Sequence, residues 1–331
     1  MKPEGTLLLT RANVAALLDL DACIAAVEQA FALYAQGKAL PPGVLGVHAR
    51  DGGFHIKAAG LELGRTYFAA KINGNFFFNR ERFGLPNIQG LVVLCDGENG
   101  YPLAVMDSIE ITIQRTGAAT AVAAKYLARA NARTATICGC GNQGRVQLRA
   151  LTRVRRIQRV FAFDVDENQA RQYAVEMAKE LRIEVQAVGD LRGAVRQSDV
   201  CVTCTPSRKA FLGRDDVPPG MFVAAVGADN EEKQELEPAL LAGNKLVVDI
   251  LEQCATIGEL HHALDAGVVT RAGVHAELAE VVAGRKPGRA SEDEITIFDS
   301  TGTALQDVAA AAVVYERAIR ASGVTRLNFF A

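Results

Sequence analysis

The spacing of apolar residues predicts a helical start to the chain. Between residues 8 and 37, Leu17, Leu20, Ile24, Val27 and Phe31 recur at steps of three and four. This spacing places side chains on one face of an α-helix. We therefore expect an amphipathic helix over about residues 8–37.

Residues 43–103 show a different pattern, with short runs rich in β-branched and aromatic residues separated by Gly, Asn and Pro. The clearest runs are 53–57, 67–72 and 90–95, and Asp96–Gly100 has the composition of a hairpin turn. No helical stretch long enough for a parallel crossover separates these runs. They predict an antiparallel or mixed sheet, and so an α+β domain.

From Arg115 onward, strand and helix patterns alternate. Such alternation predicts an α/β fold with a doubly wound parallel sheet of the Rossmann type. A last alanine-rich helix lies beyond this unit and is expected to return to the N-terminal domain. The predicted strands are 134–138, 159–164, 184–187, 200–205, 222–226 and 245–249, and the predicted helices are 118–129, 143–152, 167–181, a short one near Leu191, and 303–322.

Composition narrows the class of protein. A length of 331 residues suggests two domains, and 49 % hydrophobic against 22 % charged residues is typical of a soluble globular protein. A net charge of −2 gives no electrostatic footprint for nucleic acid, and no apolar stretch of about 18 residues suggests a membrane span. We expect no nucleic-acid or membrane partner.

The cysteines and the N-terminus bear on location and on metal binding. The first residues lack the basic start and apolar core of a signal peptide, and seven scattered cysteines suit a reducing cytoplasm. Cys201 and Cys204 have metal-ligand spacing, but no second Cys pair or His cluster accompanies them. We expect a cytoplasmic protein in which these two residues belong to the core, without a metal site.

The strongest motif is a glycine-rich loop between a strand and a helix. The strand 134–138 leads directly into Gly139, Gly141 and Gly144, with Asn142 and Gln143 between the last two. In this G-x-G-x-x-G context the glycines permit a tight turn, close approach of a pyrophosphate, and close helix–strand packing. The pyrophosphate would lie on the N–H groups at the helix N-terminus.

An acidic residue at the end of the next strand favours NAD over NADP. Asp164 stands 20 residues beyond Gly144, the position from which a carboxylate binds the adenosine ribose hydroxyls and repels a 2′-phosphate. Arg171, further along, is a candidate phosphate ligand and keeps NADP as the less favoured cofactor.

Two further segments follow predicted strands, where open α/β sheets bind ligands. The first contains Thr205 and Ser207, and the second contains Val226, Gly227 and Asp229. The position of Asp229 leaves two interpretations open. Its carboxylate either faces the ligand cleft or caps a helix expected over residues 235–241.

Lys71 and Arg115 are candidates for substrate chemistry. Lys71 ends an apolar run and precedes a polar turn expected over 72–75; a buried lysine needs an anionic partner and can have a lowered pKa. Arg115 opens the predicted alanine-rich helix beside Thr116, an arrangement suited to anions. The alternative for each is a surface salt bridge.

Several segments together resemble the ornithine cyclodeaminase/mu-crystallin family, which also contains archaeal-type alanine dehydrogenases and ketimine reductases. The resemblance runs in order over nearly the full chain. It is carried by residues 84–90, 104–107, 115–121, 139–144, 226–229 and 298–302.

The resemblance implies a homodimer of two-domain chains. Residues 1–115 with 303–331 would form the substrate-binding and dimerisation domain, and residues 116–302 the NAD-binding Rossmann domain. The implied reaction is hydride transfer at the α-carbon of a small amino or imino acid, with a 2-oxo acid as the product or co-substrate.

The resemblance also implies roles for individual residues. Lys71 corresponds to the active-site lysine, Arg115 to the arginine that holds the substrate carboxylate, and Asp229 to the acid/base carboxylate. Ser300 and Thr301 correspond to residues that close over the nicotinamide.

The sequence departs from the family pattern near the substrate. Many members carry an arginine after the Pro-Pro pair, where this chain has Gly43, and Lys57 is the candidate replacement for that charge. A cationic Lys57 would repel the distal ammonium of ornithine. Asn75 precedes an aromatic run, 76–78, which either lines the pocket or packs in a dimer core.

We therefore predict an NAD-dependent amino/imino-acid oxidoreductase, similar to alanine dehydrogenase or ketimine reductase. The alternative is ornithine cyclodeaminase, an ammonia-lyase that recycles bound NAD without net redox change.

Overall fold

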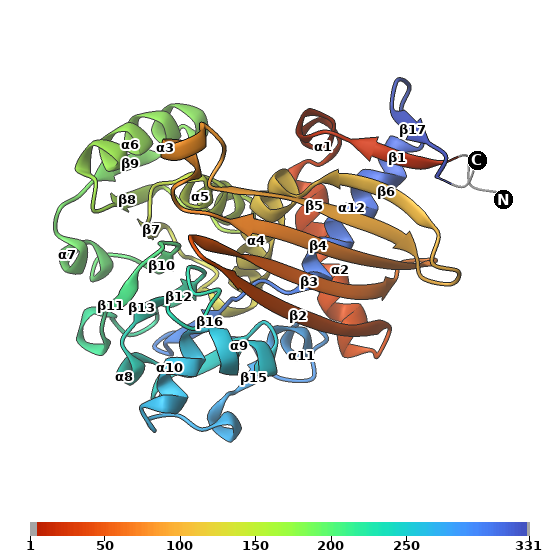
Figure 1. The fold of residues 1–331 in the computed structure, drawn as a ribbon. Helices are drawn as coiled ribbons and strands as arrows, with labels where there is room; N and C mark the ends of the chain where they lie inside the picture. Colours follow the sequence, from red (N-terminus) through yellow and green to blue (C-terminus); the bar gives the residue numbers. More distant parts are fainter. Residues whose placement is uncertain (1–4, 330–331) are drawn as a thin grey trace. The chain divides into compact units, whose positions relative to one another are not determined.

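The computed structural model describes residues 5–329 and divides the chain into two compact units (Figure 1). The first unit is Met1–Arg115 together with Thr303–Ala331, and the second is Thr116–Gly302. Among the residues described, no helix has the length and apolar character needed to cross a membrane.

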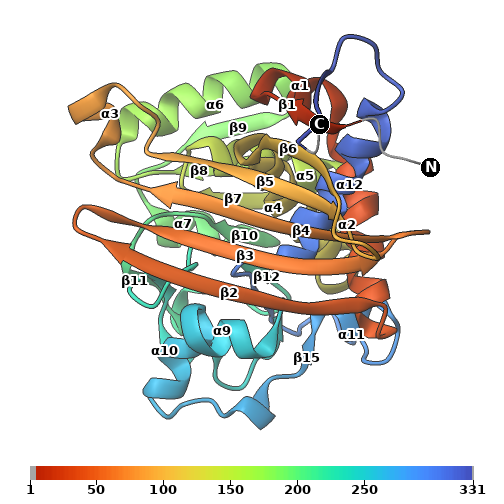
Figure 2. The same cartoon turned by 45° about the vertical axis from the view of Figure 1, so that its right-hand side comes forward.

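A seven-stranded mixed sheet forms the centre of the first unit, in the order β17-β1-β6-β5-β4-β3-β2. Neighbouring strands are antiparallel except for β1 and β6, which are parallel, so the predicted mixed sheet is confirmed. Strands β2 to β5 run side by side in Figure 2. The strands are β1 Thr6–Leu9, β2 Ala39–Ala49, β3 Gly52–Glu62, β4 Thr66–Asn75, β5 Ile88–Asp96, β6 Pro102–Asp107 and β17 Thr325–Leu327.

The single helix predicted over residues 8–37 is wrong, because two caps interrupt it. Strand β1 is followed by α1, Arg11–Leu17, whose N-cap Thr10 forms a reciprocal capping box with Asn13. A second helix, α2, Leu20–Ala35, begins after Asp19, whose carboxylate accepts the backbone N–H of Ala22. Side-chain caps of this kind satisfy the free N–H groups of a first helical turn. The remaining helices confined to this unit are α3 Asn79–Phe83 and α12 Ala304–Ala318.

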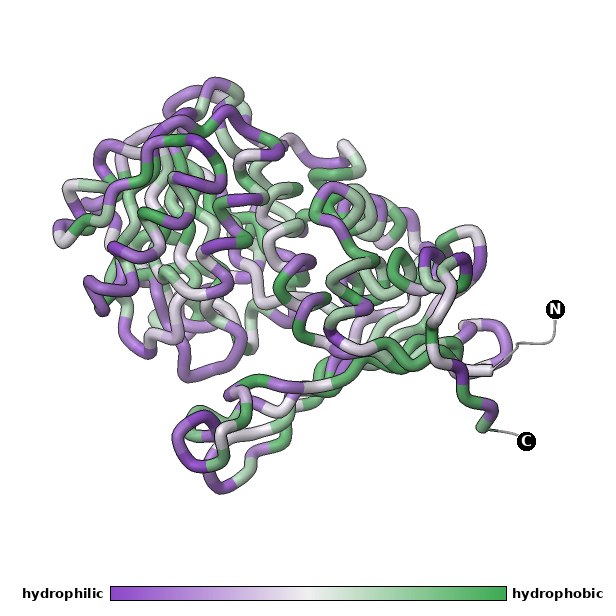
Figure 3. The backbone as a smooth tube through the Cα atoms, turned by 90° about the horizontal axis from the view of Figure 1, so that it is seen from above, coloured by the Kyte–Doolittle hydropathy of each residue, from purple (hydrophilic) through white to green (hydrophobic). Residues whose placement is uncertain are grey.

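Helices α2 and α12 pack against each other, and α12 also packs against β3 and β4. Residues that alternate along the strands face this side and are buried, as Leu61, Tyr67 and Leu94 are. Their neighbours on the opposite side include the exposed Ile72 and Leu91. Figure 3 shows hydrophobic stretches of the backbone interspersed with hydrophilic ones. An antiparallel sheet usually has one wet, polar face, so an apolar second face is unusual.

Helix α4, Ser108–Leu127, begins well before the predicted start at residue 118. The boundary between the two units falls inside it, between Arg115 and Thr116. Arg115 therefore lies within a helix and not at its N-terminus, where the free N–H groups are found. The predicted combination of guanidinium and helix N-terminus is wrong.

The second unit contains an eight-stranded parallel sheet, as predicted, in the order β15-β14-β16-β12-β10-β7-β8-β9. The chain order reverses between β7 and β10, the switch point where doubly wound folds bind ligands. The strands are β7 Thr134–Cys138, β8 Arg159–Phe163, β9 Glu184–Ala187, β10 Val200–Thr203, β12 Phe222–Ala225, β14 Lys245–Val248, β15 Ala276–Glu277 and β16 Thr296–Asp299.

The helices of this unit follow the strands, and a small parallel pair, β11 Arg208–Leu212 and β13 Gln234–Leu236, lies outside the main sheet. The helix predicted over 235–241 is wrong: its first part is β13, and a short helix begins at Pro238. The helices are α5 Asn142–Val154, α6 Glu167–Leu181, α7 Leu191–Val195, α8 Pro238–Leu241, α9 Leu251–Ile257, α10 Glu259–Asp265 and α11 Leu278–Val282, with 3₁₀ turns at Arg214–Asp216 and Arg271–Gly273.

Candidate active site

The glycine loop has the geometry that its sequence predicts. Gly139 has a φ of +100°, a backbone conformation that residues other than glycine rarely adopt. A Cβ on Gly144 would lie 2.1 Å from the carbonyl oxygen of Gly139. A Cβ on Gly141 would meet nothing within 4 Å, so this backbone is open to a ligand. Helix α5 begins here with Asn142 and Gln143, and its N-cap, Gly141, supplies no side-chain hydrogen bond. The loop fits a pyrophosphate.

Asp164 lies beside this loop. Its carboxylate accepts the backbone N–H of Cys140 at 2.8 Å and the Nε2 of Gln169 at 2.9 Å. Its contact with the ribose stays a prediction. Arg171, the candidate phosphate ligand, is exposed and pairs with Glu167 at 3.0 Å on its own helix.

The sheet brings the other predicted cofactor residues to one edge. Strands β7, β10, β12 and β16 are consecutive neighbours, and their carboxyl ends lead into the glycine loop and into three further segments. Thr301 is buried and donates its hydroxyl to Asp249 at 2.9 Å. Those three segments contain Thr205 with Ser207, Val226 with Gly227, and Ser300 with Thr301.

Asp229 follows β12 in the second unit. Its Oδ1 lies 2.6 Å from the Nζ of Lys233, and the side chain of Asp229 is 39 % exposed. No helix begins after Asp229 until Pro238, so the capping interpretation is wrong. The carboxylate is accessible, and its role as an acid or base stays a prediction.

In the first unit, Lys71 lies inside β4 and not before a turn, because residues 72–75 continue the strand. Its side chain is only 3 % exposed, and its Nζ lies 2.8 Å from both carboxylate oxygens of Asp307 on α12. Arg115 reaches the same carboxylate with its Nε at 3.1 Å and donates its Nη1 to Gln306 at 3.0 Å. Asp307 is the anionic partner that a buried lysine requires. The surface salt-bridge alternative is wrong for both residues.

Burial and charge set the protonation of this cluster. Burial lowers the pKa of Lys71 to about 7, although the charge of Asp307 opposes the shift. Burial would raise the pKa of Asp307, but the cations Lys71 and Arg115 outweigh it and lower the pKa. A lysine that titrates near neutrality can accept or donate a proton at working pH.

Lys57 and Asn75 flank this cluster on the same sheet. Lys57 is buried and stands directly opposite Lys71 in the β3–β4 register, so both side chains face the same side. The charge of Lys57 contributes to the lowered pKa of Lys71. Asn75 ends β4, and its buried Oδ1 has no hydrogen-bond partner among residues 5–329. Thr116, next to Arg115 on α4, is buried and assigned to the second unit.

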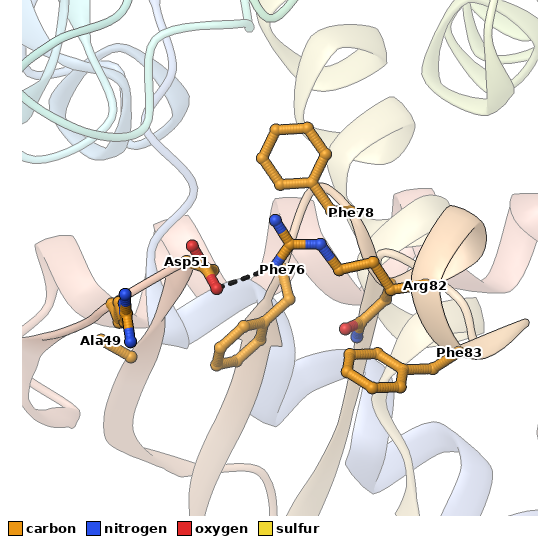
Figure 4. A pocket seen from close by; sticks show the side chains of 8 residues that line it. Ala49, Asp51, Phe76, Phe78, Arg82 and Phe83 are labelled. Atoms are coloured by element: carbon orange, nitrogen blue, oxygen red, sulfur yellow. Dashed lines mark hydrogen bonds and ion pairs between the residues drawn. The ribbon is translucent and has the colours of Figure 1, made fainter.

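A separate hollow of about 330 Å³ lies between the β2–β3 turn and the segment leading into α3. Figure 4 shows Arg82 extended toward Asp51, to which it donates at 2.8 Å, and its guanidinium lies 5.1 Å from the Phe78 ring centroid. Phe76 and Phe78 of the aromatic run line this hollow. It shares no lining residue with the Lys71–Asp307 cluster.

Three charged residues near the predicted site residues were not predicted from the sequence: Asp307, Lys233 and Glu235. Asp307 and its neighbour Gln306 interrupt an alanine- and valine-rich helix whose first half is buried. An acid at such a position needs a cationic partner, which is the signal that could have identified it. Lys233 follows Asp229 by four residues, and Glu235 was assigned to a helix that does not form.

Comparison with protein families matches residues 4–322 to the ornithine cyclodeaminase/mu-crystallin family. The chain belongs to this family. It is 43 % identical over 325 residues to an alanine dehydrogenase of Archaeoglobus fulgidus, covering 98 % of this chain and 99 % of that protein. The resemblance inferred from the motifs is confirmed.

Solved structures of family members share the fold. An archaeal alanine dehydrogenase dimer with bound NAD has a TM-score of 0.93 at 42 % identity, covering 98 % of this chain and 99 % of that one. The Δ(1)-pyrroline-2-carboxylate reductase of Thermococcus litoralis, in complex with NADH and L-proline, has a TM-score of 0.92 at 34 % identity, covering 97 % and 100 %.

The buried cluster predicts an unequal response to two similar substitutions. Asp307→Asn leaves Lys71 and Arg115 buried without their anion and should destabilise the protein by about 3–5 kcal/mol. Asp51→Asn removes an exposed ion pair with Arg82 and should cost less than about 1 kcal/mol. Urea unfolding of both variants measures the difference. Equal losses would contradict the assignment of Asp307 as the central counter-charge.

Proposed function

We propose that this protein is an NAD-dependent oxidoreductase that transfers hydride at the α-carbon of a small amino or imino acid. The observation that carries the proposal is the buried Lys71–Asp307–Arg115 cluster, in a chain whose second unit has a dinucleotide loop. Alanine dehydrogenase and pyrroline-carboxylate reductase relatives with bound NAD or NADH support it.

The first unit supplies the groups that recognise the substrate. Arg115 binds its carboxylate, because a planar guanidinium matches a carboxylate in two parallel hydrogen bonds. Gln306 and Asp307 fix the orientation of that guanidinium. Lys57 adds a second positive charge, and Asn75 is a candidate polar contact.

Lys71 and Asp229 manage protons. Lys71, with a pKa of about 7, exchanges a proton with the substrate nitrogen or with the water or ammonia that replaces it. Asp229 is assigned the acid/base role that the family pattern implies. NAD, when bound, accepts or supplies the hydride. Gly139, Gly141 and Gly144 would hold its pyrophosphate, and the segments that contain Ser207, Gly227 and Thr301 would complete its site.

The charge of the first unit favours this function over ornithine cyclodeamination. Lys57 and Lys71 face the same side of the sheet, and both contribute to the low pKa of Asp307. The distal ammonium of ornithine would add another cation beside them, which like-charge repulsion disfavours. A substrate with an uncharged or anionic side chain avoids this repulsion.

A spectrophotometric assay separates the two functions. With NADH, ammonia or methylamine and a 2-oxo acid, or with a cyclic imine, we expect net loss of NADH absorbance. With ornithine we expect neither ammonia release nor a change in NADH. Ammonia release from ornithine at constant NADH would show that the protein is a cyclodeaminase.

The lysine pKa predicts the pH dependence of amino-acid oxidation. Neutral Lys71 is the form that accepts a proton, so kcat/KM should rise through an apparent pKa of about 7 and then level. Asp307 favours the protonated lysine, so Asp307→Asn should move this rise to lower pH. Lys71→Met should abolish turnover while NADH binding, measured by fluorescence, persists. A rise that stays in place in Asp307→Asn would exclude Lys71 as the titrating group.

We also propose that the first unit forms a homodimer through the exposed face of its sheet, and that the protein is cytoplasmic. Large apolar residues on β2 to β5 are exposed on this face, whereas the solvent-facing side of an antiparallel sheet usually carries polar side chains. The archaeal alanine dehydrogenase relative is a dimer, which supports a second copy of the chain as the occupant. The seven cysteines are unpaired, as expected in a reducing compartment. The exposed apolar residues on this face are Leu40, Leu45, Val47, Phe54, Ile72 and Leu91.

A charge placed on this face should separate the subunits. Leu91, 51 % exposed, lies opposite Ile72 in the β4–β5 register, and Leu91→Glu would bury a carboxylate without a partner in the dimer. Sedimentation analysis should show a dimer for the parent protein and a monomer for this variant. Val175→Glu, at a 72 % exposed position on α6, is the matched control and should remain dimeric. A dimeric Leu91→Glu protein would place the interface elsewhere.

A further inference from the structure

Glu235 is a buried carboxylate that the proposed reaction does not use. It lies on β13 with none of its surface exposed. Its Oε1 accepts the backbone N–H of Thr205 at 2.6 Å and the Thr205 hydroxyl at 2.7 Å. Its Oε2 accepts the backbone N–H of Gly227 at 2.9 Å. One carboxylate therefore joins two separate loops.

These loops lie at the ligand-binding edge of the parallel sheet. The Thr205 loop follows β10, and the Gly227 loop follows β12, its parallel neighbour, with Thr203 opposite Ala225 at the strand ends. The first strand beyond the switch point of this sheet is β10. Both loops are therefore placed where doubly wound folds bind a dinucleotide. A group that fixes both loops affects the site without touching the ligand.

The close approach of Glu235 explains why residue 227 is glycine. A Cβ at this position would lie 2.4 Å from the carboxyl carbon of Glu235 and 2.5 Å from each of its oxygens. Contacts this short do not occur in real structures, so any side chain at 227 would displace the carboxylate. Gly227 and Glu235 are therefore fitted to each other.

Two further buried acids hold Glu235 in place. Glu259, in the first turn of α10, accepts the backbone N–H groups of Glu235 at 2.8 Å and Leu236 at 3.0 Å. Asp299, at the end of β16, accepts the N–H of Leu260 at 2.9 Å. Asp299 thus binds the backbone next to Glu259, and Glu259 binds the backbone of Glu235. The series connects the central sheet to the two loops.

The raised pKa values of these acids show that burying their charged forms costs free energy. Burial raises the pKa of Glu235, against hydrogen bonds from Thr205 and Gly227, and burial raises the pKa of Asp299 to about 7. Replacing buried charges with apolar residues of similar volume is often neutral or stabilising. Stability alone therefore does not account for Glu235, whereas the fixing of two loops does.

We propose that Glu235 is a positioning residue that locks the Thr205 and Gly227 loops into the conformation that binds the dinucleotide. The assignment of these loops to NAD rests on the proposed function. The locking itself is a property of the unliganded protein, because every contact that carries it lies within the chain.

Glu235→Gln tests the proposal, because the amide keeps the shape but replaces one acceptor oxygen with a donor that faces a backbone N–H. Hydrogen exchange of the unliganded protein should accelerate about tenfold or more in peptides covering residues 204–208 and 226–229. Exchange in the glycine loop, 139–144, and in the core strands should stay unchanged. NADH should bind about tenfold more weakly in a fluorescence titration, with little change in Tm.

Glu237→Gln is the matched control, since Glu237 carries the same side chain two residues away and is exposed. It should alter neither exchange nor NADH affinity. Thr205→Val removes the hydroxyl that donates to Glu235 and also accepts the backbone N–H of Ser207 at 3.2 Å, so in this variant residues 226–229 alone report on Glu235. Exchange in residues 226–229 should accelerate, and this variant decides the case if Glu235→Gln does not fold. Unchanged exchange in both loops, or acceleration throughout the second unit, would overturn the proposal. If the parent protein binds no NADH, the proposed function fails, while the exchange data still decide the role of Glu235.

Discussion

The first unit depends on one interaction, the ion pair that Asp307 forms with Lys71 and Arg115. These residues come from α12, β4 and α4, and none is exposed by more than a few per cent. Three charges at such depth are tolerated only as a set, because each alone would face a large desolvation penalty. The set also explains why the C-terminal helix belongs to the first unit: α12 brings the acid that the two cations need. Under the proposed function, a substrate carboxylate would meet a cationic site whose geometry is already fixed.

The second unit solves a related problem with acids in place of cations. Glu235, Glu259 and Asp299 are buried, and backbone N–H groups provide most of their hydrogen bonds. A carboxylate that accepts several N–H groups can hold loops which have no regular secondary structure to fix them. The glycine loop receives one such hydrogen bond, from the N–H of Cys140 to Asp164, and the strand before it and the helix after it determine the rest of its path. The side of the site formed by irregular loops is therefore the side with the buried acids.

The sequence predicted the structural features that depend on neighbouring residues, and it did not predict those that depend on residues far apart in the chain. The glycine loop and the parallel sheet follow from neighbouring residues, and six predicted strands agree with the structure to within two residues. The partner of Lys71 could not be found in this way, because Asp307 lies 236 positions further along the chain. Arg115 was placed at a helix N-terminus because residues 108–117 lack a clear apolar period, although α4 runs through them. Glu235 was missed since three residues of strand preceding Pro238 resemble the first turn of a helix.

The same difference applies to the two proposed binding functions: the residues for the cofactor are close together in the sequence, and those for the substrate are far apart. The dinucleotide loop is encoded in one short segment, so relatives that act on different compounds can share it. The proposed substrate recognition would depend on the β3–β4 register, which places residue 57 beside Lys71 and on the same side of the sheet. A change at position 57 alters the charge of the cluster without altering the pairing of the strands, because side-chain orientation is set by the register. Under the proposed function, Lys57 is therefore the position where a new substrate preference would arise on an unchanged fold. Gly43 pairs with Ala58, so a side chain at position 43 would face the other side of the sheet from Lys57.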